Sequence, residues 1–581
     1  MSLELLANEL LLNLFEYFNG YYLFRAFYNL NSRFNKLLIE YFRNHIFDFH
    51  YLSKQDFDLT CQEYLPLISH RIVGLHLSNT DETPNQIDLF LENDLILDQF
   101  ISLRSLSFHN VSSNELLIKI ILQFCFLHHL ICFRFLECYF EHYDISHYDT
   151  FKSFWSLPKL THCVLDFRFQ RNDRIFLPTV VSQSIKYVSI PYINWQWNDF
   201  IELLENTPNI LQLNIRLPDF INPKQLKSPV QFISALEILV SYSSSLLFNL
   251  LKNMPNLLCL IVKTTNIIID GHQWKEIFVN YLRKLKIFRC FMCCGLTYNT
   301  DKEKTVDSLL DSYRNSYWIE DHQWFIRCQW SPNDTENQIS LYTLPDRSDY
   351  SIIQPSSCTI RTKSTCSFEY DYDNDNVPSM IHFAFKHTYM YLQYIRHLHL
   401  ILPFTEILLS NLPQFDRLIH LQVGCFPFID GNMAVYQLQK LLDQSPYLYS
   451  LEILTWFPLF VQEIPLNLMS HSIRSLKFEN TSCSIDKTGI SFFNDYKCFV
   501  LINSPIGIQC EFLSLIVEKR TNIIDLVNGL PNLRTLKVRS KDDQWKNQPI
   551  NDELILWLRT RLSCLINRDT RFTKFIRLWI R

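Results

Sequence analysis

A six-residue frame, apolar-x-x-apolar-x-apolar, recurs along the chain and strongly limits the folds open to it. Successive frames of the first run start 23 to 31 residues apart, and the frame resumes after one long interruption. Alternating apolar residues predict a short strand with one buried face. A repeat of this period predicts a stack of similar units. The frames start at Ile72, Leu103, Leu130, Leu160, Ile185, Ile210, Ile233, Leu257 and Leu282, then at Ile395, Leu418, Leu448, Ile473, Cys510 and Leu533.

The segments before several frames share a second pattern. They read "DFIELLENTPNI", "LLFNLLKNMPNL", "QLQKLLDQSPYL" and "DLVNGLPNL". In each, an amphipathic helix ends, a Pro follows shortly after, and the apolar frame begins, as expected because Pro cannot continue a helix. One helix and one strand cannot bury their apolar faces alone, so neighbouring units must stack. The expected result is a parallel sheet with helices on the other side, and an ordinary α/β protein is the alternative.

The frame and its helix resemble the leucine-rich repeat family in its longer, irregular form. The resemblance covers residues 72–540 apart from the interruption, although the Asn or Cys that follows the strand in regular repeats is mostly missing. It implies an α/β fold: an irregular leucine-rich-repeat solenoid with a parallel sheet inside and helices outside.

The N-terminal stretch "LANELLLNLFEYFNGYYLFRAFYNLNSRFNKLLIEYF" is unusually apolar. Glu4 and Glu9 stand where a secretory signal needs basic residues, and no small-x-small cleavage site follows. Leu6, Leu10 and Leu14 recur at helical spacing, and Asn19-Gly20 is a break. The stretch therefore predicts amphipathic helices. So short a group buries little surface by itself, which implies a partner surface.

This stretch is similar to the F-box. The similarity lies in Leu6-Ala7-Asn8-Glu9-Leu10-Leu11, Leu14-Phe15, Tyr17-Phe18, Tyr22-Leu23 and Leu30-Asn31-Ser32-Arg33-Phe34. Ala7, Tyr22 and Phe34 depart from the family's Pro, Asp and Trp. The partner of the family is the Skp-type adaptor of a cullin-RING ubiquitin ligase. The resemblance implies that Glu9 helps cap or orient the first helix and that the adaptor groove receives Leu6, Ala7, Leu14, Phe15, Phe18 and Leu23. The alternative is that the helices only cover the end of the repeat array.

These patterns divide the chain into six parts. The interruption carries alternating β-formers, which predict two or three antiparallel strands, and an acidic Asp-Tyr run expected to be a loop. The parts are 1–45 (F-box helices), 46–71 (helical linker or cap), 72–290 (first repeats), 291–394 (β-rich insertion with acidic loop), 395–540 (second repeats) and 541–581 (C-terminal helix and strand cap).

Composition argues against several classes of protein. Only 9 residues are Gly, and neither of the Gly-rich phosphate-binding motifs occurs, so no cofactor is expected. The net charge of -5, without a basic tail, argues against nucleic-acid binding. The most apolar later stretch contains Lys119 and Arg134 and does not predict a membrane span. The odd total of 17 Cys, without a regular framework, favours a reducing compartment, cytoplasmic and/or nuclear.

Two clusters have residue types that could form metal or catalytic sites. "CFLHHLIC" groups Cys125, His128, His129 and Cys132, and "CFMCC" groups Cys290, Cys293 and Cys294. Neither has a second cluster at zinc-finger distance, so core residues, surface histidines and idle thiols are the preferred interpretation. The acidic run at 369–375 lacks the Gly and terminal Glu of an EF-hand. No metal and no catalysis are predicted.

The predicted function is substrate recognition in a Skp-cullin-F-box type ubiquitin ligase, with a non-catalytic leucine-rich-repeat scaffold unconnected to ubiquitin as the alternative. Residues at the fifth position of a frame, and just after the sixth, should face the open side of the sheet. The C-terminal members lean basic, which favours a protein substrate with an acidic or phosphorylated segment. The candidates are His109, Arg216, Lys263, His399, Glu452, Lys477, Lys537 and Arg539.

Overall fold

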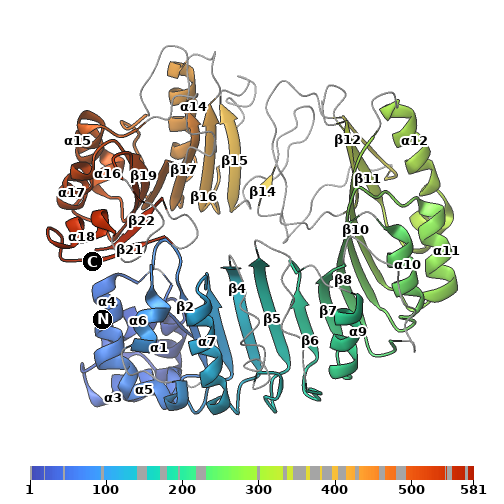
Figure 1. The fold of residues 1–581 in the computed structure, drawn as a ribbon, viewed down its shortest axis with the longest axis horizontal. Coiled ribbons are helices and arrows are strands. Elements are labelled where there is room, and N and C mark those ends of the chain that lie inside the picture. Colours follow the sequence, from blue (N-terminus) through green and yellow to red (C-terminus); the bar gives the residue numbers. More distant parts are fainter. Residues whose placement is uncertain are drawn as a thin grey trace. The chain divides into compact units, whose positions relative to one another are not determined.

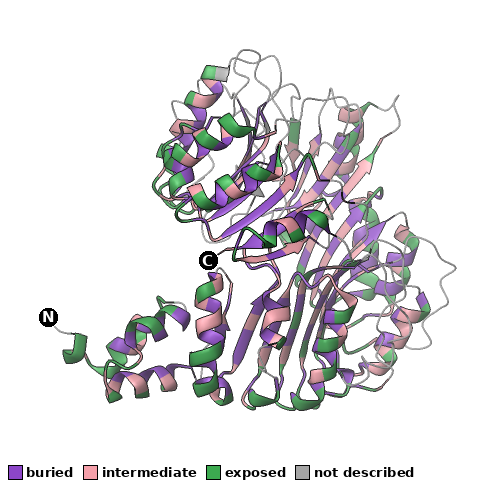
Figure 2. Ribbon diagram, turned by 60° about the vertical axis from the view of Figure 1, so that its left-hand side comes forward, coloured by how far each residue is buried: buried purple, intermediate pink, exposed green. Residues whose placement is uncertain are grey.

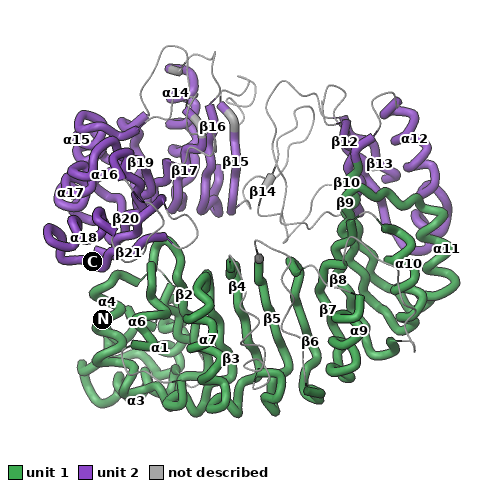
Figure 3. The backbone as a smooth tube through the Cα atoms, viewed as in Figure 1, with its two compact units in different colours: residues 1–294 green, residues 295–581 purple. Residues whose placement is uncertain are grey.

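The chain forms two compact units, residues 1–294 and residues 295–581 (Figure 3). Both mix helices with large parallel sheets, so the fold is α/β (Figure 1). The computed structural model describes residues 3–18, 20–42, 46–50, 52–92, 97–140, 154–169, 180–193, 197–217, 230–241, 243–296, 301–330, 337–344, 361–366, 380–381, 396–402, 414–425, 431–456, 465–478, 492–543, 545, 552–569 and 574–580.

Unit 1 contains a sheet whose strands follow one another in chain order from β1 to β10. Every neighbouring pair in this run is parallel. The strands are β1 (Ile46–Asp48), β2 (Gly74–Ser78), β3 (Ser105–His109), β4 (Cys132–Phe140), β5 (His162–Phe169), β6 (Tyr187–Ile190), β7 (Gln212–Arg216), β8 (Ala235–Ser241), β9 (Cys259–Thr265) and β10 (Ile287–Gly295). A parallel order of this kind needs a crossover between strands, and helices supply several of them.

Polar side chains cap the N-termini of several helices of unit 1. Ser113 and Ser243 accept hydrogen bonds at the starts of α7 and α10, and Asp270 forms a capping box with Gln273 at the start of α11. The helices are α1 (Asn8–Phe15), α2 (Gly20–Phe27), α3 (Ser32–Tyr41), α4 (Lys54–Leu59), α5 (Leu65–Ile68), α6 (Gln86–Glu92), α7 (Asn114–Leu122), α9 (Trp197–Asn206), α10 (Ser244–Lys252) and α11 (Gly271–Tyr281). Short turns of other helix types lie at Leu3–Leu5, Thr60–Tyr64, Ser69–Arg71, Leu97–Gln99 and Gln123–Phe126.

The core of unit 1 lies between one face of the sheet and the helices. Phe49 stacks edge-on against Phe90 of α6, and Phe288 of β10 contacts Trp274 of α11. Figure 2 shows buried residues running along the strands, with exposed residues on the helices. Alternate strand residues therefore point into this core, and their neighbours lie on the opposite face.

The Pro-containing segments before the strands form the same tight turn. The N–H of Ile210 donates to the carbonyl of Thr207 at 3.2 Å, and Leu257 and Leu533 donate in the same way to Met254 and Leu530. Pro occupies the second position of each turn, where its fixed φ is favourable. The next residue in each turn is Asn, and its side-chain amide donates to a carbonyl of the preceding unit: Asn209 to Gln183 (2.8 Å), Asn256 to Gln231 (2.9 Å) and Asn532 to Ile508 (2.7 Å). These turns therefore tie adjacent units together.

Unit 2 begins with three antiparallel strands, inside the segment where two or three were predicted. β11 (Ile326–Trp330) pairs with β12 (Gln338–Thr343) and with β13 (Arg361–Ser364). The helix α12 (Lys302–Ser312) in this segment was not predicted, and a π-helical turn follows at Tyr317–Asp321. The acidic run at 369–375 lies outside the described residues.

The larger sheet of unit 2 is parallel over most of its width. Its order is β14-β15-β16-β17-β18-β19-β20-β22-β21, with antiparallel pairing only at β20–β22 and β22–β21. Its strands are β14 (Met380–Ile381), β15 (His397–Leu402), β16 (His420–Cys425), β17 (Ser450–Trp456), β18 (Ser475–Phe478), β19 (Phe512–Val517), β20 (Thr535–Ser540), β21 (Leu565–Arg568) and β22 (Ile576–Trp579). The helices are α14 (Gly431–Asp443), α15 (Asp495–Asn503), α16 (Pro505–Ile508), α17 (Arg520–Gly529) and α18 (Glu553–Arg559). One cluster of buried apolar residues joins the strands to these helices.

The repeat register holds with one correction. Where the frames are described, their first, fourth and sixth residues are buried, except at Leu282. There the sixth residue, Ile287, is 47% exposed, and the buried set is Leu285, Phe288 and Cys290. The true frame starts at Leu285, because "LRKLKIFRC" contains two overlapping apolar patterns. The sheet also starts earlier than predicted, since β1 lies in the segment expected to be a helical linker.

No helix among the described residues combines the length and apolarity needed to cross a bilayer.

Candidate binding surfaces

The first candidate surface is a group of exposed large apolar residues at the N-terminus. We call it the N-terminal apolar patch. Tyr17 is 86% exposed and Leu5 is 77% exposed, values unusual for side chains of this size. Its members are Leu3, Leu5, Leu10, Tyr17, Phe18, Tyr22 and Leu30. So many exposed large apolar side chains within 28 residues of sequence mark a candidate interaction site.

Arg33 of α3 holds the N-terminal segment in place. Its guanidinium donates to the carbonyls of Glu4 and Leu6 at 2.5 Å each, and to the side-chain oxygen of Asn8 at 2.9 Å. Asn31, which caps α3, also donates to the Glu4 carboxylate at 3.1 Å. The rigid, multi-donor guanidinium suits this role. The segment before α1 is thereby fixed on α3, close in sequence to the exposed Leu30.

Two of the predicted adaptor contacts are buried inside the chain itself. Phe15 is 0% exposed and packs on Phe27 and Tyr41, with ring centroids 5.0 and 5.7 Å apart. Leu23 is also 0% exposed. Both side chains support the helices and are not available to a partner, so their assignment as contact residues is corrected. Leu10 and Phe18, which are 54% and 41% exposed, remain accessible.

The other predicted residues of this region lie at or near the surface. Leu6 and Leu14 are half-buried, Phe18 is 41% exposed, and Ala7 and Glu9 are exposed. Ala7 precedes α1 without a side-chain cap, and Glu9 lies in the first turn of that helix. A carboxylate in the first turn interacts favourably with the helix dipole.

The second candidate surface is the face of the unit 1 sheet that lies opposite the helices. We call it the polar face of unit 1. The strand pairing aligns one side chain from each strand in a single row across it. The row is Asp48, His76, Ser107, Arg134, Val164, Ser189, Asn214, Glu237, Ile261 and Arg289. The predicted residues His109, Arg216 and Lys263 lie on the same face, and Lys263 donates to Glu237 at 2.9 Å.

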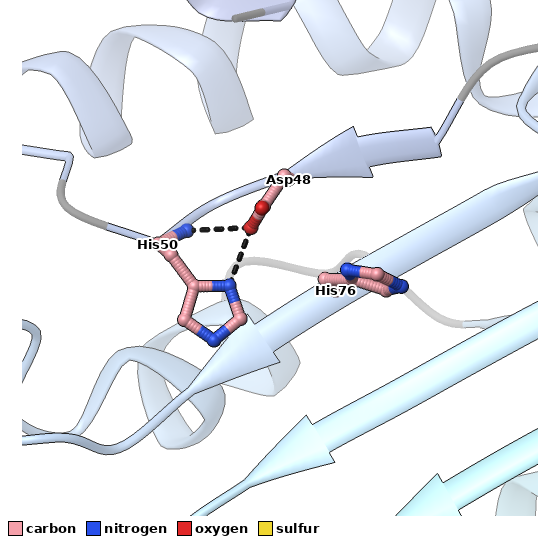
Figure 4. A group of neighbouring side chains, drawn as sticks. All are labelled: Asp48, His50 and His76. Atoms are coloured by element: carbon pink, nitrogen blue, oxygen red, sulfur yellow. Dashed lines mark hydrogen bonds and ion pairs between the residues drawn. The ribbon is translucent and has the colours of Figure 1, made fainter. Parts of the chain in front are cut away.

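At the β1 end of this row, Asp48, His50 and His76 form a compact group (Figure 4). Their potential ligand atoms lie within 4.8 Å of one another, and all three residues are half-buried. His50 Nδ1 lies 2.5 Å from Asp48 Oδ1, and the His50 backbone N–H donates to the same oxygen at 2.9 Å. Burial alone would raise the pKa of Asp48, but the hydrogen bonds and charge of His50 lower it below its usual value.

His109 adjoins this group, with its ring centroid 4.5 Å from that of His50. Burial, with the neighbouring His50 and His76, lowers the pKa of His109 to about 4. Burial also lowers the pKa of His76 below its ordinary value. Both imidazoles are therefore neutral at physiological pH. Such side chains can accept a proton or a metal ion on a ring nitrogen.

The third candidate surface is the corresponding face of the larger sheet in unit 2, the polar face of unit 2. Its row is His399, Gln422, Glu452, Lys477, Ser514, Lys537 and Arg577. Glu452 is only 7% exposed and accepts a hydrogen bond from Gln422 at 3.0 Å, while His420 lies 3.3 Å away. Burial alone would raise the pKa of Glu452, but these two hydrogen bonds and the charge of Lys477 lower it overall.

The sequence pattern predicted Lys537 as an exposed substrate contact, but the structure shows that it is buried. It is 5% exposed, and its ammonium lies 3.9 Å from the fully buried carboxylate of Asp569. Arg577 of β22 donates to the same carboxylate at 2.6 Å. A buried charge needs partners of this kind, so Lys537 stabilises the C-terminal strands. His399, Lys477 and Arg539 are partly accessible and remain candidates.

Among the described residues, neither of the Cys and His clusters named from the sequence brings three potential ligand atoms to metal-ligand spacing. Cys125, His128 and His129 are exposed, and His129 Nδ1 lies 2.9 Å from the Lys159 ammonium. Cys290, Cys293 and Cys294 lie along β10. Within the described ranges, the only group of three or more His, Cys, Asp or Glu residues with metal-ligand spacing is Asp48, His50 and His76.

Sequence reasoning missed this group although part of it was visible. His76 is the fifth residue of the first frame, the position expected on the open side. Asp48 and His50 alternate in "FDFH", but they precede the first recognised frame. Only the pairing of β1 with β2 brings them beside His76.

No protein-family model matches this chain, and no curated protein matches it at a significant level.

Proposed function

We propose that the chain is the substrate-recognition subunit of a Skp-cullin-F-box type ubiquitin ligase, built as an F-box followed by an irregular leucine-rich-repeat solenoid. The N-terminal helices bind the Skp-type adaptor and, through it, a cullin. The polar faces of the sheets bind a protein substrate. The subunit itself carries out no chemistry and acts in the cytoplasm and/or the nucleus.

The N-terminal apolar patch is the observation that carries this proposal. Its exposed Leu, Phe and Tyr side chains lie on or next to helices whose own core is already filled by buried residues such as Phe15, Leu23 and Phe27. The additional apolar side chains on the surface lower solubility and add nothing to this core. Their exposure therefore supports binding to a protein partner. The resemblance to the F-box supplies the identity of that partner.

The repeat architecture supports the second half of the proposal. Strands in chain order, each preceded in several units by a helix and a Pro-Asn turn, are expected of stacked repeats. Proteins of that kind bind partners along the strand face. Arg134 is exposed and Lys477 and Arg539 are partly accessible on the polar faces, which favours a substrate segment carrying carboxylates or phosphates.

An adaptor-binding experiment tests the proposal. The full chain with Leu10→Asp and Phe18→Asp is compared with the wild type for binding to purified Skp-type adaptor. Both side chains are exposed, so the fold should survive. Loss of two apolar anchors should weaken adaptor binding by about 100-fold or more.

The matched control is Leu122→Asp, which changes a leucine of similar exposure (60%) on α7. This variant should bind the adaptor as the wild type does. If the double variant also binds as the wild type does, the N-terminal helices do not bind the adaptor. The alternative, a binding scaffold unconnected to ubiquitin, is then preferred.

A further inference from the structure

We propose that Asp48, His50 and His76 form a binding site for a divalent transition metal ion, with Zn²⁺ as the best match. The site belongs to the polar face of unit 1 and does not depend on the proposed role in a ubiquitin ligase. It uses residues from the β1 strand, its C-terminal extension and the β2 strand.

The ligand types select the class of ion. Two imidazoles and one carboxylate are typical of zinc sites, which take three protein ligands when a fourth position stays open. Mg²⁺ and Ca²⁺ prefer oxygen ligands and would gain little from two histidines. Mixed nitrogen and oxygen donors therefore indicate Zn²⁺ or a neighbouring first-row ion.

The backbone holds the three side chains close together. Asp48 and His76 are aligned partners in the parallel β1–β2 pair, so they project side by side from adjacent strands. His50 lies two residues after Asp48 and therefore on the same face. The potential ligand atoms all lie within 4.8 Å of one another, and modest side-chain rotations would bring them around one ion.

Two further observations point to a ligand. The Nε2 atom of His76 is buried and has no hydrogen-bond partner among the described residues, which is costly for a polar nitrogen. His50 Nδ1 lies 2.5 Å from Asp48 Oδ1, so the imidazole and the carboxylate already face each other where an ion would bind.

Close approach of the two strands is part of the site. Gly74 is paired with Ile46, and a Cβ atom at Gly74 would lie only 2.5 Å from Cγ1 of Ile46. Any larger residue would press β1 away from β2 two residues before Asp48 and His76. The glycine therefore sets the strand spacing on which the ligand distances depend.

Titration calorimetry with Zn²⁺ and absorption spectroscopy with Co²⁺ test the site on the full chain after removal of metals with EDTA. Wild type should bind one equivalent of Zn²⁺ that His76→Asn and Asp48→Asn each lose or bind at least about 100-fold more weakly. The Co²⁺ form should show the absorption of nitrogen and oxygen coordination without a thiolate charge-transfer band. Excess Mg²⁺ should not displace the ion.

His399→Asn is the matched control, because it removes a partly buried strand histidine from the polar face of unit 2. It should bind Zn²⁺ as the wild type does. Circular dichroism of the metal-free variants confirms that they remain folded. The proposal is overturned if both ligand variants retain the wild-type stoichiometry and affinity, if wild type binds no Zn²⁺, or if the Co²⁺ spectrum shows thiolate ligands.

Discussion

The two polar faces are built on the same strand pattern but use their charges differently. On the face of unit 2, Glu452, Lys537 and Arg577 are all less than 9% exposed and bind other side chains of that unit. On the face of unit 1, Arg134 is exposed and the histidine group is half-buried.

This difference shows that position in a repeat does not reveal the role of a charged residue. Lys537 and Arg134 occupy the same frame position, the fifth, in their respective repeats. One is part of a buried ion-pair network, which mainly holds strands together, and the other is accessible to solvent and to a partner. Three substitutions test this difference between the two faces.

Asp569→Ala should have the largest effect. It removes the carboxylate shared by Lys537 and Arg577 and leaves two buried cations without that partner. The free energy of unfolding should fall by about 3–5 kcal/mol, measured by guanidinium denaturation. Asp525→Ala, which changes an exposed carboxylate on α17, is the control and should lie within about 0.5 kcal/mol of wild type. Equal stability of both variants would show that the network does not hold the C-terminal strands.

Glu452→Gln should have an intermediate effect that depends on pH. Because the folded state lowers the pKa of Glu452, its charge stabilises the protein above the ordinary pKa of 4.5, and this contribution is lost as pH falls through the folded value. The variant should lose about 2 kcal/mol at neutral pH, as expected for a charged hydrogen bond. Denaturation at several pH values should then show a shallower loss of stability in acid than wild type. If the free energy of unfolding of the two proteins falls in parallel with decreasing pH, the charge of Glu452 does not contribute to stability.

Arg134→Ala should have the smallest effect on stability. Its side chain is exposed on β4, so the free energy of unfolding should change by no more than about 0.5 kcal/mol. Under the proposed function, the same variant should capture less of an acidic substrate protein. A loss of stability as large as that of Asp569→Ala would mean that the polar face of unit 1 is also held together by its charges.

The sequence predicted the strands well because their signal is local. The alternation of apolar residues lies within six positions, and it correctly predicted the buried residues of most frames. It failed at Leu282, where two apolar patterns overlap and only pairing with β9 selects the second. The sequence showed the Pro-Asn segments as helix ends. It did not show the hydrogen bonds that their Asn side chains donate to the preceding unit.

The surfaces were harder to predict because they depend on distant parts of the chain. The helix pattern of α1 places Leu11 and Phe15 on one side and Leu10 on another, and both sides are apolar. Only the packing of Phe15 on Phe27 and Tyr41 shows which side is buried. Similarly, the antiparallel return of β22 beside β20 places Arg577 and Asp569 near Lys537. No local pattern reveals these partners.

The Pro-Asn turns also bear on how such a long chain folds. Each of the three Asn side chains reaches back only 24 to 26 residues, and the parallel strands pair with their immediate neighbours in sequence. Most contacts therefore close short loops, whose entropic cost is modest. Folding can start at any well-formed unit and extend to its neighbours, with a low contact order for so many parallel strands.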